Sequence, residues 1–120
     1  MSKAGLPDRE CVFCKRIERG EFDYFDGYNV AFQPLGPVTP GHFLVVPRAH
    51  VANAFASPVH AGRALKFAAF LANQMDLGAA NFITSAGSAA TQTVFHLHVH
   101  IVPRRDDDGL HLPWTGQARA

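Results

Sequence analysis

Three histidines alternate with apolar residues late in the chain, and this alternation constrains the fold more than any other feature. His96, His98 and His100 are separated by single apolar residues. Successive side chains of a β-strand point to opposite faces, so the pattern predicts a strand with three imidazoles on one face and an apolar stripe on the other. The apolar face is expected to be buried. The strand is expected to end at Pro103, whose nitrogen cannot donate to a ladder.

Three interpretations of the alternating imidazoles remain open from the pattern alone. The first is a half-exposed strand whose histidines share no role. The second is a metal site, although the outer pair would lie roughly 13 Å apart at a rise of about 3.3 Å per residue, too far for one ion to bind all three. The third is catalysis, because imidazole serves as a nucleophile or proton carrier near neutral pH.

Composition is that of a small globular domain. The 120 residues, 48% hydrophobic and 18% charged, suit one domain with one core. The net charge of +1, with no Lys/Arg block, does not favour a nucleic-acid partner. No run approaches about 18 apolar residues and the first ten residues hold no apolar run, so neither a membrane span nor a signal peptide is predicted. The two cysteines indicate a reducing compartment, and we expect a cytoplasmic protein.

The strands predicted before the histidine stretch are short apolar runs bounded by turn residues. They cover residues 29–32, 42–46 and 81–85. The first two are expected to form a hairpin across a Pro- and Gly-rich loop. His42, at the entrance of its strand, is predicted to be structural rather than catalytic. Residues 86–91 are predicted to be a loop of small residues, without the Gly-Lys-Ser of a P-loop.

Two helices complete the predicted elements. Residues 11–19 form a short helical turn that Gly20 stops. A long helix begins at Pro58 behind the N-cap Ser57, and Gly78 is expected to be its C-cap. Strands around one dominant helix predict the α+β class, with an antiparallel sheet and the long helix on one face.

A pair of cysteines, Cys11 and Cys14, has the Cys-x-x-Cys spacing of half a zinc site. The remaining two ligands would have to come from elsewhere in the chain. The alternative is that both are small buried apolar residues. A redox role is disfavoured, because the motif does not stand in a βαβ context.

The segment from Gln92 to Arg104 resembles the signature of the histidine triad (HIT) family, in which three histidines alternate with apolar residues. The cysteine pair and its neighbours, Cys-Val-Phe-Cys-Lys, resemble the amino-terminal motif of this family. Residues 40–51, Pro-Gly-His-Phe-Leu-Val-Val-Pro-Arg-Ala-His-Val, resemble its middle motif. The three motifs occur in order over residues 11–104, which is much more specific than the triad alone.

The resemblance implies an architecture and an assembly. It implies a sheet of about five strands per subunit, a long helix, a short N-terminal helix, and homodimers in which two sheets join. The chain then divides into a flexible lead at 1–10, a HIT domain at 11–105 and a tail at 106–120. The tail carries the single tryptophan, Trp114, and is expected to dock on the body or on a partner subunit.

The resemblance also implies a reaction at the α-phosphate of a purine nucleotide. His98 would be the nucleophile, forming a nucleotidyl-histidine that water hydrolyses or an acceptor takes. His100 would donate to an α-phosphate oxygen, and His96 would hold the arrangement or bind zinc. Gln92 would bond a bridging or leaving-group atom, and the Thr93 hydroxyl would pass a proton to the departing group.

Binding residues follow from the same motifs. Cys11, Cys14, His50 and His96 match the ligands of a structural zinc. The expected nucleotide-binding residues are Phe13, Phe32, Leu35, Ser85, Gln92, Thr93, His98 and His100. The chain departs from the family at Pro34, where an Asp or Asn often holds the ribose, and at Ser85, which replaces a common Asn.

Several functions remain open at this point. A HIT-type hydrolase or nucleotidyltransferase would cleave either phosphoramidates or dinucleoside polyphosphates. The Pro103-Arg104 pair resembles the second branch, but it discriminates weakly. The alternatives are a nucleotide-binding or interaction module with little turnover, for which Pro34 is the best support, and a metalloprotein whose histidines serve zinc catalysis.

Overall fold

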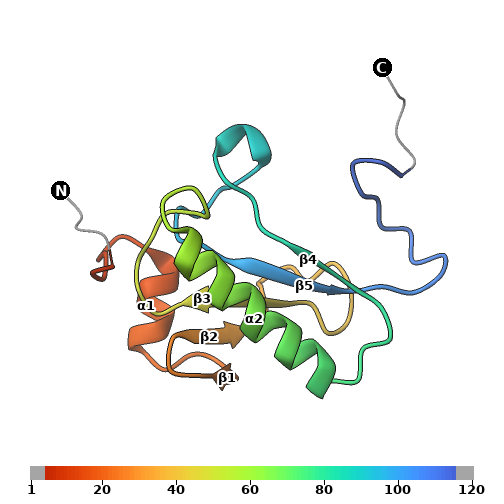
Figure 1. The fold of residues 1–120 in the computed structure, drawn as a ribbon, viewed down its shortest axis with the longest axis horizontal. Coiled ribbons are helices and arrows are strands. Elements are labelled where there is room, and N and C mark those ends of the chain that lie inside the picture. Colours follow the sequence, from red (N-terminus) through yellow and green to blue (C-terminus); the bar gives the residue numbers. More distant parts are fainter. Residues whose placement is uncertain (1–4, 116–120) are drawn as a thin grey trace.

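The protein is a five-stranded antiparallel sheet with one helix packed on each face (Figure 1). The computed structural model describes residues 5–115. The elements in chain order are α1 (Val12–Glu18), β1 (Tyr24–Phe25), β2 (Asn29–Phe32), β3 (Phe43–Pro47), α2 (Pro58–Gln74), β4 (Ala80–Ile83), a 3-10 turn η1 (Ser88–Ala90) and β5 (Val99–Pro103). The strand order is β1-β2-β3-β5-β4, and every neighbouring pair is antiparallel. The α+β prediction is confirmed.

Helix α2 covers one face of the sheet and buries the larger apolar cluster. The cluster consists of Ala31, Phe43, Val45, Ala64, Phe67, Ala68, Leu71, Ala72, Val99 and Ile101. Small alanines on the helix allow it to approach the strands closely, and Phe67 and Leu71 fill the space between them. Truncation of Phe67 to alanine would therefore cost about 3–5 kcal/mol of unfolding free energy.

Only the amino-terminal end of α2 matches the prediction from the sequence. Ser57 is the N-cap, and its hydroxyl accepts a hydrogen bond from the His60 amide at 3.2 Å. The prediction that Gly78 caps the other end is wrong. The helix ends at Gln74, and the left-handed residue that follows is Asp76, with a φ of 57°. A short polar side chain tolerates this conformation better than most, so glycine is not required there.

Helix α1 covers part of the opposite face. It closes a smaller cluster made of Phe13, Val30, Phe32, Leu44 and Val46. Its N-cap is Cys11, whose Sγ accepts a hydrogen bond from the Cys14 amide at 3.3 Å. One helical turn between the two cysteines therefore places both thiols at the same end of α1.

Strand β5 begins later than the histidine pattern predicts. The ladder with β3 pairs Leu44 with His100 and Val45 with Val99, so the strand includes one histidine of the three. The preceding residues, with His96 and His98, approach the sheet as a bend. The prediction of a regular strand with three imidazoles on one face is therefore wrong at its amino-terminal end. The predicted end at Pro103 is confirmed.

The other strands match their predicted places to within two residues, and the hairpin of β2 with β3 is confirmed. Two elements escaped prediction: β1, which is only two residues long, and the 3-10 turn η1 inside the small-residue loop. After β5, Arg104 fixes the course of the chain, because its guanidinium binds both carboxylate oxygens of Asp108 at 2.9 and 3.1 Å and Oδ1 of Asn81 at 2.7 Å.

The ends of the chain extend past the described residues. The division into a lead at 1–10, a domain at 11–105 and a tail at 106–120 therefore stays a prediction. Gly5 is tied to the body, because its amide donates to the His50 carbonyl at 2.8 Å. Within residues 5–115, no helix combines the length and apolar character needed to cross a membrane.

Candidate functional site

A cavity of about 570 Å³ lies beside the α1 face of the sheet, and we call it the central cavity. Its walls include Phe13, Phe32, Leu35, Thr93, His98 and His100. The fold therefore gathers six of the eight predicted nucleotide-binding residues around one space. Ser85 and Gln92 are not among its lining residues, and their contact with a nucleotide stays a prediction.

The ring of His98 is held in a defined tautomer. Its Nδ1 lies 2.8 Å from the carbonyl oxygen of His96, which can only accept, so Nδ1 carries the proton and donates. In the neutral ring Nε2 is then unprotonated and keeps its lone pair. Within residues 5–115, Nε2 has no hydrogen-bond partner. Burial lowers the pKa of His98 below its ordinary value, although the hydrogen bond to His96 opposes the shift.

A chain of hydrogen bonds sets the tautomer of His100 in the opposite sense. The Val38 amide donates to Nδ1 of His42 at 3.1 Å, so His42 holds its proton on Nε2. That nitrogen lies 2.9 Å from Nδ1 of His100 and donates to it. The proton of neutral His100 therefore sits on Nε2, which is available as a donor. Burial, with smaller contributions from His98 and His42, lowers the pKa of His100 to about 4.

His42 is the residue whose part in the site the sequence prediction understated. It is 4% exposed and touches His100 directly, so it is structural in the sense that it positions a neighbour. The missed signal lies in the pairing of strands. Because Leu44 pairs with His100, the residue two places before Leu44 lies diagonal to His100 on the same face.

Four side chains converge at the amino-terminal end of α1. The donor atoms of Cys11, Cys14, His50 and His96 all lie within 4.8 Å of one another. Nδ1 of His96 is 3.3 Å from the Cys11 thiol, 3.5 Å from the Cys14 thiol and 3.2 Å from Nδ1 of His50. The Cys14 thiol is 3.3 Å from Nδ1 of His50. We call this group the Cys/His cluster.

The distances fit a tetrahedral ion. Bonds of about 2.3 Å to sulfur and about 2.0–2.1 Å to nitrogen give tetrahedral edges of about 3.3–3.8 Å, close to the four pair distances of 3.2–3.5 Å. In the protein without a metal, burial raises the pKa of the Cys14 thiol to about 11, so the thiol holds its proton. A divalent cation would displace that proton and bind the thiolate. The residues present therefore fit a metal ion.

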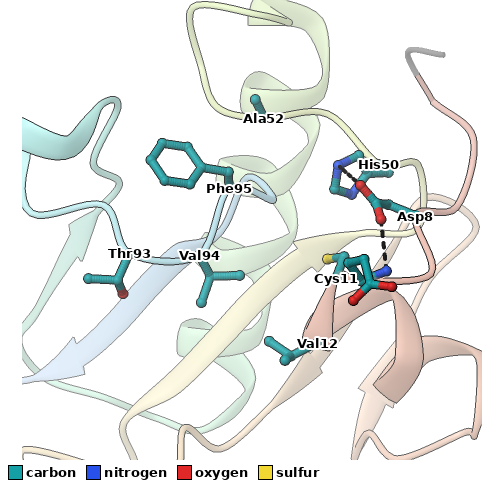
Figure 2. Close-up of a pocket in the computed structure, with 9 residues that line it drawn as sticks. Asp8, Cys11, Val12, His50, Ala52, Thr93, Val94 and Phe95 are labelled. Carbon is teal, nitrogen blue, oxygen red and sulfur yellow. Dashed lines mark hydrogen bonds and ion pairs between the residues drawn. The ribbon is translucent and has the colours of Figure 1, made fainter. Parts of the chain in front are cut away.

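The far nitrogens of the two cluster histidines are also oriented. His96 is fully buried, and its Nε2 donates to the Pro47 carbonyl at 2.7 Å, which leaves Nδ1 to face the thiols. Nε2 of His50 lies 3.9 Å from a carboxylate oxygen of Asp8 (Figure 2). Partners of this kind fix which ring nitrogen faces a metal and strengthen it as a ligand. Burial lowers the pKa of His96 to about 4, so the ring is neutral at pH 7.

Gln92 and Thr93, the polar pair before the triad, differ in burial. Gln92 is 4% exposed, and its amide nitrogen donates to the carbonyls of Ala52 and Val94 at 2.7 and 3.0 Å. Its oxygen accepts from the Gly87 amide at 2.9 Å. These bonds fix the loop that leads into the triad. Thr93, in contrast, is exposed and lines the central cavity.

The aromatic end of the central cavity is built from two elements. Phe13 of α1 meets Phe32 of β2 edge-on at 5.4 Å and meets His98 at 5.2 Å between ring centroids. Arg16 stacks its guanidinium on Phe32 at 4.0 Å, a contact that the sequence did not reveal. Leu35 is 99% exposed and stands at the rim, beside Pro34.

Comparison with known proteins agrees with this geometry. The model of the HIT domain family matches residues 19–107. The chain is 34% identical over 123 residues to the adenosine 5'-monophosphoramidase HNT1 of Saccharomyces cerevisiae, covering 98% of this chain and 77% of the relative. It is 31% identical over 118 residues to protein hit of Bacillus subtilis, covering 90% and 81%.

The solved structures include a HIT family hydrolase from Clostridium thermocellum that is similar to this chain. It superposes with a TM-score of 0.73 at 33% identity, over 83% of this chain and 95% of that one. The family model covers well over half of the chain, and its range includes the histidine triad together with His42 and His50. The fold, the matched motifs and these similarities together show that the chain belongs to the HIT family.

Proposed function

We propose that the protein is a nucleotide hydrolase that cleaves at the α-phosphate of a purine nucleotide conjugate through His98. The observation that carries the proposal is the pair of opposite tautomers beside one cavity. His98 offers an unprotonated Nε2, and His100 offers a protonated one. A nucleophile next to a hydrogen-bond donor is the combination that displacement at phosphorus requires.

The reaction has two steps. Nε2 of His98 attacks the α-phosphorus, the bond from phosphorus to the leaving nitrogen or oxygen breaks, and the leaving group takes its electron pair and a proton that the Thr93 hydroxyl passes on. His100 donates to a nonbridging oxygen while negative charge develops. Water then attacks the nucleotidyl-histidine and the P–N bond breaks, with its electron pair returning to Nε2 of His98. The proton that water releases restores the Thr93 hydroxyl, and the mononucleotide leaves with His98 neutral. Without substrate His98 is neutral, which the lowered pKa supports.

The substrate branch that we favour is a phosphoramidate of AMP. The yeast relative is named an adenosine 5'-monophosphoramidase and aligns with nearly all of this chain. The aromatic pair Phe13 and Phe32, with Arg16 stacked on it, is a suitable wall for a purine ring. Leu35 would close that wall, and Ser85 and Gln92 would contribute through the loops that flank it.

The Cys/His cluster is proposed to hold a structural zinc through Cys11, Cys14, His50 and His96. The mixture of two thiols and two imidazoles suits zinc. All four protein ligands would be used, so the ion would join α1 to the segment before β5 and would not reach substrate. Free thiols at both cysteines agree with a reducing compartment, and we place the protein in the cytoplasm.

A homodimer is proposed along β4, one of the two edge strands. Phe82 and Ile83 on this strand are 39% and 37% exposed, and an unpaired apolar edge is a natural pairing site. Light scattering coupled to size exclusion tests this: Ile83→Lys should convert a dimer to a monomer. A wild-type monomer at micromolar concentration would contradict it.

The alternative is a nucleotide-binding module with little turnover. The observation in its favour is Pro34, which lines the central cavity and offers no hydrogen bond from its side chain to a ribose. Binding of AMP without any product would support this alternative.

Intact mass spectrometry separates the two functions. The protein is mixed with an AMP phosphoramidate and quenched within milliseconds at neutral pH. The hydrolase predicts a mass increase of one adenylyl group, present in wild type and in the exposed-histidine control His111→Ala, and absent from His98→Ala. Product formed at the wild-type rate by His98→Ala would overturn the proposal.

A further inference from the structure

A second cavity lies next to the central cavity. This outer cavity has a volume of about 430 Å³ and shares Val12, Thr93 and Val94 with the central cavity. Figure 2 shows Thr93 and Val94 on one side of it and Asp8 with His50 on the other. The two cavities therefore border the same three residues, and Thr93 lies where they meet.

The order of groups along the two cavities follows from the proposed reaction. Phe13, which pairs with Phe32, meets His98 at 5.2 Å between ring centroids in the central cavity, and Thr93 lines both cavities. With a purine at the aromatic wall and its α-phosphate at His98 and His100, the atoms beyond phosphorus extend past Thr93. The outer cavity is the space they would enter.

The two cavities carry charge of opposite sign. Lys15, Arg16 and Arg19 line the central cavity, against one carboxylate, Glu21. The outer cavity is lined by Asp8 and Glu10, and no lysine or arginine of residues 5–115 lines it. A divalent ion bound to two thiolates has no net charge, so the two carboxylates set the sign of the outer cavity with or without the metal.

The carboxylate of Asp8 is held in place by the backbone, whereas the side chain of Glu10 is exposed. One oxygen of Asp8 accepts a hydrogen bond from the Glu10 amide at 2.8 Å, and the other lies 3.9 Å from Nε2 of His50. Phe95, which is 48% exposed, adds an apolar surface to the same cavity. The outer cavity thus combines two carboxylates, one of them positioned by a backbone amide, with an apolar wall, which suits a cationic group on an alkyl or aryl stem.

We propose that the outer cavity is the leaving-group subsite. In this proposal Asp8 and Glu10 select amine leaving groups that carry a cationic group at the end far from the reacting nitrogen. This inference rests on the proposed hydrolysis at His98 and adds the class of leaving group. The negative charge of a polyphosphate leaving group would be repelled by the same carboxylates. The subsite therefore favours phosphoramidates over dinucleoside polyphosphates.

The experiment uses AMP phosphoramidates that differ only in the far end of the amine. The leaving amines are a diaminoalkane with a terminal ammonium, an alkylamine of the same length, and an aminoalkanoate with a terminal carboxylate. The zinc-loaded wild type should hydrolyse the cationic compound with a kcat/KM about tenfold above the anionic one, as expected for one half-buried and one exposed carboxylate. Added salt should shrink this ratio.

Substitutions of the two carboxylates test whether they cause the preference for the cationic compound. Glu10→Gln should lower the ratio of the cationic to the anionic compound while turnover of the neutral compound stays, and adding Asp8→Asn should bring the ratio close to one. Glu10→Gln is the cleaner of the two, because Asp8 lies near His50. Metal content and melting temperature are measured for each variant. Glu18→Gln is the matched control, since Glu18 lies on α1, is exposed and does not line the outer cavity.

The outcomes separate the inference from the function on which it rests. Equal kcat/KM for the three compounds, or a ratio that survives in the double variant with metal bound, would overturn the leaving-group subsite alone. Absence of turnover for the neutral compound as well would overturn the proposed hydrolysis, and the inference would fall with it.

Discussion

His96 and His98 are two residues apart, and the fold presents opposite ring nitrogens of the two. His96 gives Nε2 to the Pro47 carbonyl and turns Nδ1 toward two thiols. His98 gives Nδ1 to the His96 carbonyl and leaves Nε2 without a partner within residues 5–115. The same side chain is therefore a candidate ligand at one position and a candidate nucleophile at the other.

The difference arises from the backbone rather than from the side chains. A carbonyl oxygen accepts only, so whichever ring nitrogen it contacts must carry the proton. His96 precedes the ladder of β5 and lies against the last residue of β3, where the Pro47 carbonyl is within reach. His98 lies one step nearer the strand and bends back on its own chain. A short irregular segment before β5 thus separates the two roles.

The largest effect is expected from removing the nucleophile. His98→Ala should lower kcat/KM for an AMP phosphoramidate by on the order of 10⁴-fold or more, as for other lost nucleophiles. Zinc content should be unchanged, because the metal would face Nδ1 of His96 and not His98. Steady-state kinetics with metal analysis checks both. Loss of zinc together with activity would show that the two histidines do not act separately.

The next effect is expected from the Cys/His cluster and falls on stability. Cys14→Ser should lose zinc, and the free energy of unfolding should fall by about 4 kcal/mol under conditions where free zinc exceeds the wild-type dissociation constant a thousandfold. Urea unfolding with and without zinc measures this.

Turnover per folded molecule should fall far less in Cys14→Ser than in His98→Ala. His111→Ala, which alters an exposed histidine outside the cluster, is the control and should keep both zinc and stability. If the free energy of unfolding of the wild type were the same with zinc and with a chelator, the metal would have no structural role.

A smaller effect is expected from His42, which touches no reacting atom in the proposed reaction. His42→Phe removes the donor to Nδ1 of His100 and should lower kcat by about 10- to 100-fold, because a misdirected catalytic group costs that much. KM should change little. His42→Gln keeps a donor and an acceptor and should recover part of kcat. Wild-type kcat in His42→Phe would show that His100 is oriented by other groups.

The sequence predicted the parts of the molecule that depend on local pattern. The N-cap at Ser57, the hairpin of β2 with β3 and the apolar face of the last strand follow from residue type and periodicity alone. The helical turn at Cys11 brought both thiols to one end of α1, as the Cys-x-x-Cys spacing indicates.

Features that depend on tertiary contacts were not predictable from one sequence. The bend that holds His96 apart from β5 requires the Pro47 carbonyl, 49 residues earlier in the chain. The contact of His42 with His100 requires the register of β3 against β5. The end of α2 at Gln74 depends on Asp76 accepting a left-handed conformation, which the glycine rule assigns to Gly78.

The smallest effect is expected in the pH dependence of stability at His100. Its pKa in the folded protein is about 4, below the ordinary 6.5, mainly because it is buried. As the pH falls from 6.5 toward 4, the unfolded chain binds a proton that folded His100 does not, so the free energy of unfolding falls. Above pH 6.5 and below pH 4 this contribution no longer changes.

The measurement compares wild type with His100→Asn by urea unfolding at pH 7, 5.5 and 4.5, with zinc held at one concentration. The variant should lose stability less steeply over this range, by at most about 1.4 kcal/mol per pH unit for one proton. Acid release of a metal affects both proteins and cancels in the difference. Parallel curves would mean that folded His100 takes up its proton as readily as the unfolded chain, and burial would then not be what keeps its ring neutral.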